Sequence, residues 1–342
     1  MRRQSRRSDG RCGVSFRDVA FAVPARTRFD PVDHLLALDP GRRGIAGFFV
    51  PGGALGAARA LVGARSVLIC TGFVVAEGMA ESDGPPGAAV LGRALRRLGA
   101  RVRYTSDPAV LPVLEATLRV LDEPADVFAY PEGPSAAREV LEREQPTHLV
   151  AIERPGRGRE GDYLNARGVS VAAWNRPLDE MFIWSGARQP GSRRGWPVPG
   201  ARGSARPVNP RRRGPRPVTI AVGDGGNEIG MGCVRARLAR EGALMARIAS
   251  MVAVDHLVVA GVSNWGAYGI VAQLGRLAGQ RLLHTPSDER KLIDACVKAG
   301  AVDGLTRRSE PTVDALDADT HAAVVALLGL SWSDRSSPGE RV

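Results

Sequence analysis

Short apolar runs alternate with segments of helical spacing along most of this 342-residue chain. The apolar runs predict strands and the intervening segments predict helices, because the two structures differ in the spacing of their buried side chains. The expected strands are 66–73, 101–105, 125–130, 148–152, 218–222, 256–260 and 281–284. The expected helices are 87–98, 108–121, 135–144, 234–248, 265–277, 287–299 and 318–330. This order predicts an α/β fold, with a layered, mostly parallel sheet flanked by helices and right-handed crossovers.

One segment interrupts this alternation. Residues 186–217 contain nine arginines and no acid, and they are rich in proline and glycine. Such a composition has too few aliphatic side chains to form a core, so we expect a disordered insertion. The expected organisation is a weakly ordered segment at 1–30, an α/β domain at 31–330 that contains the insertion, and a tail at 331–342.

The net charge of +11 lies mainly outside the expected core of the domain. Without the nine arginines of 186–217 the net charge is +2, and without the five arginines and one Asp of 1–11 as well it is −2. A near-neutral body argues against a nucleic-acid-binding face built into the fold. A non-enzymatic alternative is polyanion binding through 186–217, which the scarcity of aromatic residues there (Trp196 only) disfavours.

The cysteine pattern and the hydropathy indicate a cytoplasmic protein. The cysteines are far apart in the sequence and form no CxxC pair, which indicates reduced thiols without a disulfide framework or a zinc knuckle. They are Cys12, Cys70, Cys233 and Cys296. No apolar run is long enough to cross a bilayer, and no apolar segment of a secretory signal follows the arginine-rich start. We therefore expect no membrane partner.

The sequence GDGGNEIGMG at 223–232 follows the expected strand 218–222 directly. Five glycines surround Asp224, Asn227 and Glu228, whereas an ordinary turn needs one or two glycines. Glycines at this density let a backbone approach a ligand closely, and acids held in such a loop can bind a hard cation or move a proton. The structural alternative is a tight strand-to-helix turn with incidental acids.

Polar side chains also follow three other expected strands. In a parallel sheet, ligands bind beyond the carboxyl ends of the strands, so these loops are expected to share one edge with the glycine-rich loop. The candidates are Thr71 and Gly72 at the end of the first strand, Glu81 and Asp83 after it, Glu153, Arg154, Asn165 and Arg167 after 148–152, and Ser263 and Asn264 after 256–260. Neither a GxSxG elbow nor a Walker loop is present.

Several of these residues have an alternative role in stabilising the fold rather than in binding a ligand. Glu81 and Asp83 precede a helix, where acids favour the positive end of the helix dipole. Glu153 follows a buried strand and could pair with Arg154 or Arg167, since a buried charge needs a partner. Ser263 and Asn264 could cap the next helix. Carboxylates from several loops, without His or Cys nearby, suit Mg²⁺ or Mn²⁺ better than zinc.

With these motifs taken together, the chain resembles the D-glutamate cyclase family from about residue 30 to about residue 330. The two specific pieces are GDGGNEIGMG at 223–232 and VVAGVSNWGAYG at 258–269. The supporting pieces are TGF at 71–73, ESDGPPGA at 81–88, IERPGR at 152–157, PLDEMF at 177–182, GAVDG at 300–304 and EPTVDAL at 310–316. One departure is the arginine-rich insertion, which stands where the family has a short connection.

The resemblance implies an α/β fold, a divalent-metal site and the dehydration of D-glutamate to 5-oxo-D-proline. The expected metal ligands come from Glu81, Asp83, Asp224 and Glu228, with Glu153 as a further possibility. The expected catalytic residues are Asp224, Glu228, Glu153 and Asn227. The expected substrate-binding residues are Thr71, Gly72, Arg154, Asn165, Arg167, Gly225, Gly226, Ser263 and Asn264.

In this scheme Arg154 or Arg167 holds the α-carboxylate of the substrate, and the N–H groups of Gly225 and Gly226 stabilise oxyanion charge. A carboxylate that is not engaged by the metal acts as the base. The partner is then a small amino acid, nucleic acid is not expected, and a homo-oligomer is possible. The enzymatic alternative is a metal-dependent phosphohydrolase, because acid-rich loops at a sheet edge also suit phosphate esters.

Overall fold

The computed structural model describes residues 30–186 and 215–331. The compact unit that begins at Pro31 contains all the elements described below. The predicted weakly ordered segment at 1–30 and the tail at 331–342 lie almost entirely outside the described residues. The same holds for the predicted insertion, of which only Gly186 and residues 215–217 are described.

Six parallel strands form the central sheet in the order β5-β4-β1-β6-β7-β8. They are β1 (Ser66–Thr71), β4 (Arg101–Ser106), β5 (Val127–Ala129), β6 (His148–Ile152), β7 (Val218–Gly223) and β8 (His256–Val259). The chain moves outward from β1 to β5 and then returns to the other side of β1. The strand order therefore reverses between β1 and β6, which is where an open α/β sheet places its ligand.

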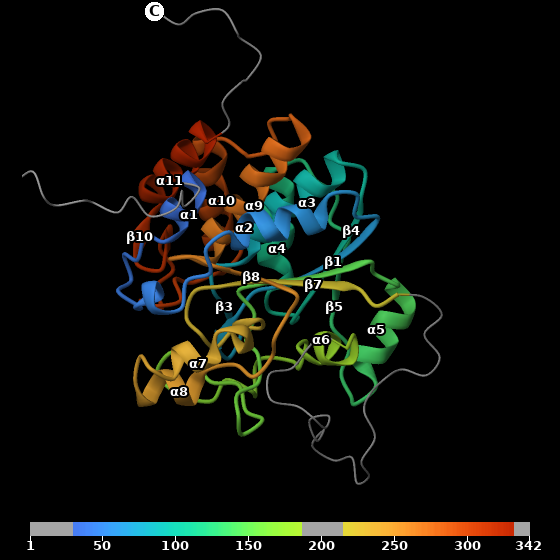
Figure 1. Cartoon of the computed structure of the whole chain (residues 1–342), viewed down its shortest axis with the longest axis vertical. Helices are drawn as coiled ribbons and strands as arrows, with labels where there is room; N and C mark the ends of the chain where they lie inside the picture. Colours follow the sequence, from blue (N-terminus) through green and yellow to red (C-terminus); the bar gives the residue numbers. More distant parts are fainter. Residues whose placement is uncertain (1–29, 187–214, 332–342) are drawn as a thin grey trace, which may run out of the picture. The chain divides into compact units, whose positions relative to one another are not determined.

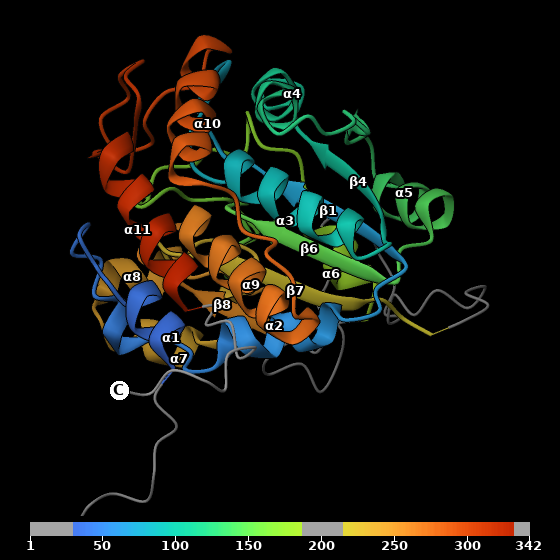
Figure 2. The ribbon, with the colours of Figure 1, turned by 90° about the horizontal axis from the view of Figure 1, so that it is seen from above.

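Helices cover both faces of the sheet, which confirms the predicted α/β layering (Figure 1; Figure 2). The larger helical layer contains α1 (Pro31–Leu36), α2 (Gly53–Leu61), α3 (Pro85–Arg97), α4 (Leu111–Val120), α9 (Ser263–Ala278), α10 (Pro286–Lys298) and α11 (Ala318–Leu330). The smaller layer contains α5 (Ala136–Glu144), α6 (Glu180–Trp184), α7 (Arg235–Leu238) and α8 (Ala243–Ile248).

Alternate strand residues divide between the two cores. Ile69 and Val150 pack into the core beneath the larger layer, whereas Cys70 and Ala151 pack into the core on the other face. Both sets are fully buried, so the strands are apolar on both sides, as parallel strands covered by helices must be. Burying one such aliphatic side chain contributes about 1.5–3 kcal/mol, which explains why short continuous apolar runs mark these strands.

Two sequence-based predictions of secondary structure were wrong in detail. The helix expected over 234–248 is interrupted between α7 and α8, where Gly242 has a φ of 131°. The strand expected at 281–284 is absent from the described residues, because Leu282 packs into the core of the larger helical layer rather than into a ladder. Among the described residues, no helix has both the length and the apolar character needed to span a membrane.

The sequence patterns also missed several short elements. These are α1, α2, α6, the 3₁₀ helices η1 (Ile45–Gly47) and η2 (Met231–Cys233), and the hairpins β2 (Val74–Ala76)–β3 (Met79–Ala80) and β9 (Thr312–Val313)–β10 (Leu316–Asp317). Two- and three-residue strands carry too little periodicity to be found by pattern alone.

Candidate active site

The four predicted polar loops meet at the carboxyl edge of the sheet. Three of them line one pocket together with Arg43, residues 304–307 and Asp314, and the loop after β8 donates hydrogen bonds to two of its carboxylates. The pocket lies at the point where the strand order reverses. It is lined by Arg43, Phe73, Val75, Glu81, Asp83, Glu153, Asn165, Ala166, Arg167, Asp224, Gly225, Asn227, Glu228, Gly304, Leu305, Arg307 and Asp314. Its floor is rich in carboxylates, and its cationic groups are arginines.

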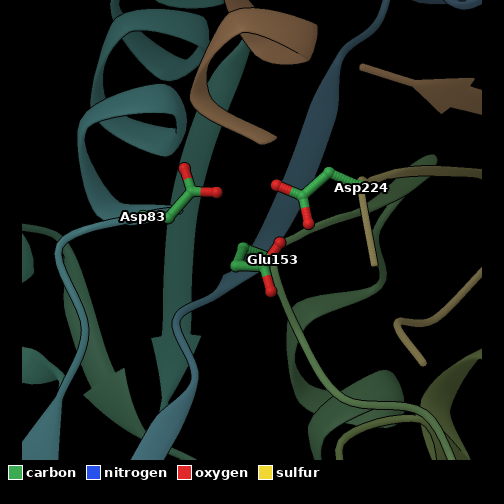
Figure 3. Close-up of side chains that lie close together, drawn as sticks. All are labelled: Asp83, Glu153 and Asp224. Carbon is green, nitrogen blue, oxygen red and sulfur yellow. The ribbon is translucent and has the colours of Figure 1, made fainter. Parts of the chain in front are cut away.

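Three carboxylates from different loops converge in this pocket. One oxygen each of Asp83, Glu153 and Asp224 lies within 4.8 Å of the others, and all three residues are buried. Figure 3 shows their side chains pointing toward one another. Buried like charges at this spacing repel unless a cation or protons compensate them. This carboxylate triad could therefore hold a metal ion, and an all-oxygen donor set suits a hard divalent cation.

The N-terminus of α9 holds the carboxylate triad in place. The backbone N–H of Ser263 donates to Asp83 Oδ2 and to Asp224 Oδ2, both at 3.0 Å, and the N–H of Asn264 donates to Asp83 Oδ1 at 2.9 Å. The hydroxyl of Ser263 donates to Glu153 Oε2 at 2.6 Å. These donors are the unsatisfied N–H groups of a helix start, which favours negative charge.

A glycine lets the loop of Asp83 approach the loop of Glu153. Gly84 has a φ of 101°, and a Cβ built there would lie 2.8 Å from Thr71 Oγ1 and 3.0 Å from Glu153 Cβ. Asn264 also stabilises the loop of Asp83, because its Oδ1 accepts hydrogen bonds from the N–H groups of Gly84 and Gly87 at 3.1 and 2.8 Å. Ser263 and Asn264, expected as substrate-binding residues, thus hold the walls of the pocket.

The electrostatics of the triad follow from its burial. Burial raises the pKa of Asp83 and of Glu153 well above the usual range, and the neighbouring carboxylates raise both further. Burial also raises the pKa of Asp224, but Arg43 opposes this effect and the value is about 6. Without a bound cation, the negative charge of these buried carboxylates is therefore energetically unfavourable.

An arginine that was missing from the predicted site supplies part of this compensation. Arg43 precedes η1 and places Nη1 at 2.6 Å from Asp224 Oδ1 and Nη2 at 2.8 Å from Asp314 Oδ1. Burial disfavours its charge, yet the carboxylates of Asp224, Asp314 and Glu153 together raise its pKa above the usual value. Asp314 was missed as well, and burial raises its pKa to about 7 despite Arg43.

Both carboxylate oxygens of Glu228 accept hydrogen bonds from backbone N–H groups of its own loop. Its Oε1 accepts from the N–H groups of Asp224 and Gly225 at 3.2 and 2.6 Å, and its Oε2 accepts from Gly226 N–H at 2.8 Å. The two glycine N–H groups expected to bind oxyanion charge are therefore occupied by Glu228. Asn227 lines the pocket, and its Nδ2 donates to Leu164 O at 2.8 Å.

Arg154 lies outside the residues that line the pocket. It is fully buried, its Nη1 pairs with Asp107 and donates to Gly72 O at 3.0 Å, and its Nη2 donates to Arg176 O at 2.7 Å. Its guanidinium therefore joins loops beneath the site and is not presented to a ligand. Thr71 and Gly72 are likewise outside the lining, at the buried end of β1.

Three further predicted residues lie in the pocket wall. Asn165 and Arg167 belong to a loop whose turn is closed by Asn165 Oδ1, which accepts from Arg167 N–H at 2.9 Å. Arg167 is exposed, and its Nη2 lies 3.5 Å from Leu305 O. Glu81 is buried, and its Oε1 has no hydrogen-bond partner among the described residues. Burial raises the pKa of Glu81 well above the usual range.

Two comparisons with known proteins show the family of this chain. The model of the family described as "D-glutamate cyclase-like, C-terminal" matches residues 32–191 and 208–329. The human protein named "D-glutamate cyclase, mitochondrial" is 32% identical over 269 residues, which is 74% of this chain and 39% of the human protein. The match thus spans about two fifths of the length of that relative.

The fold and the pocket define an α/β protein with buried carboxylates at the switch point of a parallel sheet, arranged so that they could hold a cation. Within that class, the chain belongs to the D-glutamate cyclase-like family. The resemblance seen in the sequence motifs is thereby confirmed.

Proposed function

We propose that this protein cyclises D-glutamate to 5-oxo-D-proline with loss of water. The observation that carries the proposal is the buried carboxylate triad, bordered by arginines, in a member of the D-glutamate cyclase-like family. The human relative bears the name of this activity. A small amino acid with two carboxylates and one ammonium group matches a pocket that offers both guanidinium groups and carboxylates.

The reaction joins the amine of the substrate to its own γ-carboxylate carbon. One C–N bond forms and one C–O bond breaks, and the departing oxygen leaves as water with two protons from the ammonium group. Because both reacting groups belong to one molecule, correct orientation supplies a large part of the rate. The pocket must therefore fold the substrate so that nitrogen and carbon meet.

Asp83, Glu153 and Asp224 would hold a divalent cation, Mg²⁺ or Mn²⁺. The structure supports this assignment because the three oxygens converge and because burial raises the pKa of Asp83 and of Glu153, so that their negative charge lacks full compensation. A bound divalent cation would supply Lewis-acid polarisation of a carboxylate. Ser263 holds the three carboxylates in position, because its N–H and its hydroxyl donate hydrogen bonds to them.

The arginines of the pocket suit the carboxylates of the substrate. Arg167 and Arg307 lie on two loops that meet where Arg167 contacts Leu305 O. Guanidinium groups bind carboxylates through paired hydrogen bonds and fix their orientation. We assign the α-carboxylate to this side of the pocket, in place of the buried Arg154. Glu228 and Asn227 would act by holding the glycine-rich loop in shape.

The direct test incubates the purified protein with D-glutamate and either Mn²⁺ or Mg²⁺ and measures 5-oxoproline, with L-glutamate as the control. Product from the D-enantiomer supports the proposal. Absence of product with every divalent cation would remove it. Hydrolysis of generic phosphate esters in a parallel assay would favour the phosphohydrolase alternative instead. The cytoplasmic location and a homo-oligomeric state stay predictions.

A further inference from the structure

Asp314 sits in an unusual backbone position. It and Ala315 form the two-residue loop between β9 and β10, with φ angles of 54° and 63°. Such a hairpin loop needs positive φ at both positions, and glycine, asparagine or aspartate normally occupies them. Asp314 fits this preference but Ala315 does not, so neighbouring groups must hold Ala315 in this conformation.

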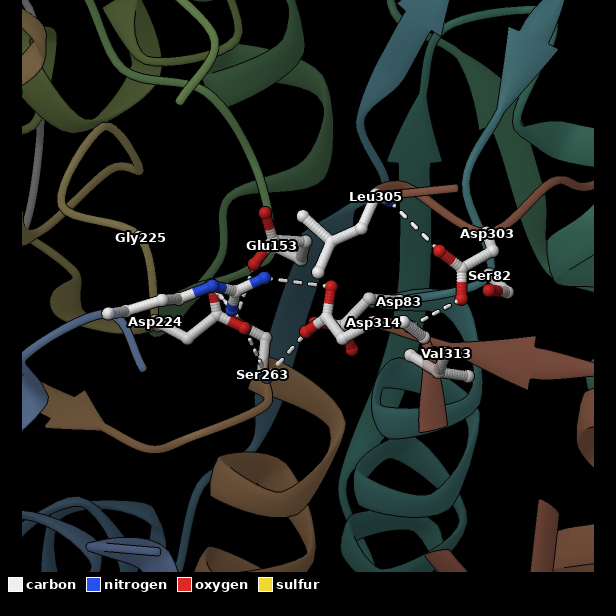
Figure 4. Close-up of polar contacts among 12 residues, drawn as sticks. Ser82, Asp83, Glu153, Asp224, Gly225, Ser263, Asp303, Leu305, Val313 and Asp314 are labelled. Carbon is white, nitrogen blue, oxygen red and sulfur yellow. Dashed lines mark hydrogen bonds and ion pairs between the residues drawn. The ribbon is translucent and has the colours of Figure 1, made fainter. Parts of the chain in front are cut away.

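Side chains from two other segments hold this hairpin. Asp303 Oδ2 accepts from Ala315 N–H at 2.7 Å and from Thr312 Oγ1 at 2.8 Å. Ser82, the neighbour of Asp83, donates its hydroxyl to Thr312 O at 2.8 Å. Figure 4 shows Asp303 and Ser82 beside the hairpin and Asp314 in the same part of the pocket as Asp83 and Asp224.

A buried histidine, His321, holds the backbone carbonyl of Val313 in the hairpin. Trp265 Nε1 donates to His321 Nδ1 at 2.8 Å, and His321 Nε2 lies 3.1 Å from Val313 O. Since Nδ1 accepts a hydrogen bond, Nε2 carries the proton and donates to Val313 O. The residue directly before Asp314 is thus tied to α9 and α11, the first of which also positions the triad.

This support leaves one carboxylate oxygen of Asp314, a residue that lines the pocket, without a partner. Asp314 is 8% exposed and lines the pocket, and its Oδ1 is engaged by Arg43 at 2.8 Å. Its Oδ2 is buried and has no hydrogen-bond partner among the described residues. A buried acceptor without a donor is costly, which indicates that a ligand supplies the donor.

We infer that Asp314 binds the α-ammonium group of the substrate. This inference rests on the proposed function, since it assigns one group of D-glutamate to one residue of that site. The triad is assigned to the cation, and both oxygens of Glu228 already accept backbone N–H groups. A carboxylate held rigidly by Arg43 offers its second oxygen in a fixed direction, which suits a compact cation with three donors.

Glu81 is the competing candidate, because its Oε1 is also unpartnered. Among the described residues, however, neither a hydrogen bond nor an ion pair anchors its carboxylate. Asp314 combines an unpartnered oxygen with an anchored one and with a hairpin that other residues hold in position.

The experiment compares two ligands that differ only in the ammonium group. In steady-state assays with D-glutamate, the KM of each variant is measured, together with the inhibition constant of glutarate, the analogue without an amine. Asp314→Asn should raise the KM for D-glutamate roughly 10- to 100-fold, the range for a hydrogen bond to a charged group. It should leave the inhibition constant of glutarate unchanged. Asparagine tolerates positive φ, so the hairpin should persist.

A matched control is Asp317→Asn in the same hairpin, where the exposed side chain caps α11 and asparagine caps equally well. It should change neither constant. The assignment would be overturned if Asp314→Asn raised the KM for D-glutamate and the inhibition constant of glutarate equally, or if it left the KM for D-glutamate unchanged. Selective weakening of D-glutamate by Glu81→Gln instead would transfer the role to Glu81. Absence of turnover by the wild type would defeat the proposed function, and the inference with it.

Discussion

Glu228 provides a sharp test of the way the structure assigns roles. Sequence motifs predicted it as a metal ligand and a catalytic residue, whereas the structure gives its carboxylate three backbone N–H donors at 2.6–3.2 Å. Glu228→Gln keeps the size of the side chain but turns one oxygen into an NH₂ group. That group would face either the Gly226 N–H or the pair from Asp224 and Gly225.

The expected cost can be worked out from these contacts. The variant loses at least one charge-assisted hydrogen bond, which contributes about 1.5–3 kcal/mol, and places two buried donors against each other. We expect the free energy of unfolding to fall by about 2–4 kcal/mol, a large share of the roughly 5–15 kcal/mol typical of a folded protein. Urea denaturation followed by circular dichroism measures this change.

The matched control is Glu142→Gln on the exposed surface of α5, which should change stability by less than about 0.5 kcal/mol. Activity of Glu228→Gln should fall together with its stability, because the loop that carries Asp224 loosens. A variant as stable as the wild type but without activity would refute this reasoning. It would return Glu228 to the direct chemical role that the sequence suggested.

Two further predictions concern the hairpin and the pH dependence of stability. Ala315→Gly should raise the free energy of unfolding by about 0.5–1 kcal/mol, because glycine takes the positive φ of 63° without the clash of a Cβ; an unchanged or lower midpoint in urea would contradict the strain. For Asp255, burial acts to raise the pKa, but hydrogen bonds from Arg216 and Thr219 outweigh it and lower the value from 3.8 to about 2. This stabilisation is present above pH 4 and is lost as the pH falls from about 4 to about 2; after allowance for solvent screening it is worth about 1 kcal/mol, so acid unfolding of Asp255→Asn should lack this component.

The sequence predicted the fold because its signals are local and repeated. Each buried parallel strand is a short apolar run, and the alternation with helices leaves few arrangements for the sheet. The rule that ligands bind beyond the carboxyl ends of the strands then brought Asp83, Glu153 and Asp224 to one edge. Those three residues come from three separate loops and now lie within 4.8 Å of one another.

The residues that the sequence missed depend on long-range packing. Arg43 comes from a segment before η1 and meets Asp314 from the far end of the chain, and no spacing rule links the two. Asp314 was inside the EPTVDAL piece at 310–316, but its importance lies in a positive φ that only the folded hairpin reveals. Arg154 shows the reverse case, because this charged residue of the IERPGR piece at 152–157 is buried and joins loops beneath the site.

The central claim is that a divalent cation in the carboxylate triad is needed to cyclise D-glutamate. The most direct measurement titrates the metal-free protein with Mn²⁺ and follows formation of 5-oxoproline from D-glutamate, for the wild type and for Asp224→Asn. The account predicts that the wild-type rate rises from background and saturates near one cation per protein molecule, while the variant needs far more Mn²⁺ or stays at background. A full rate from the metal-free wild type, or the same titration curve for both proteins, would contradict it.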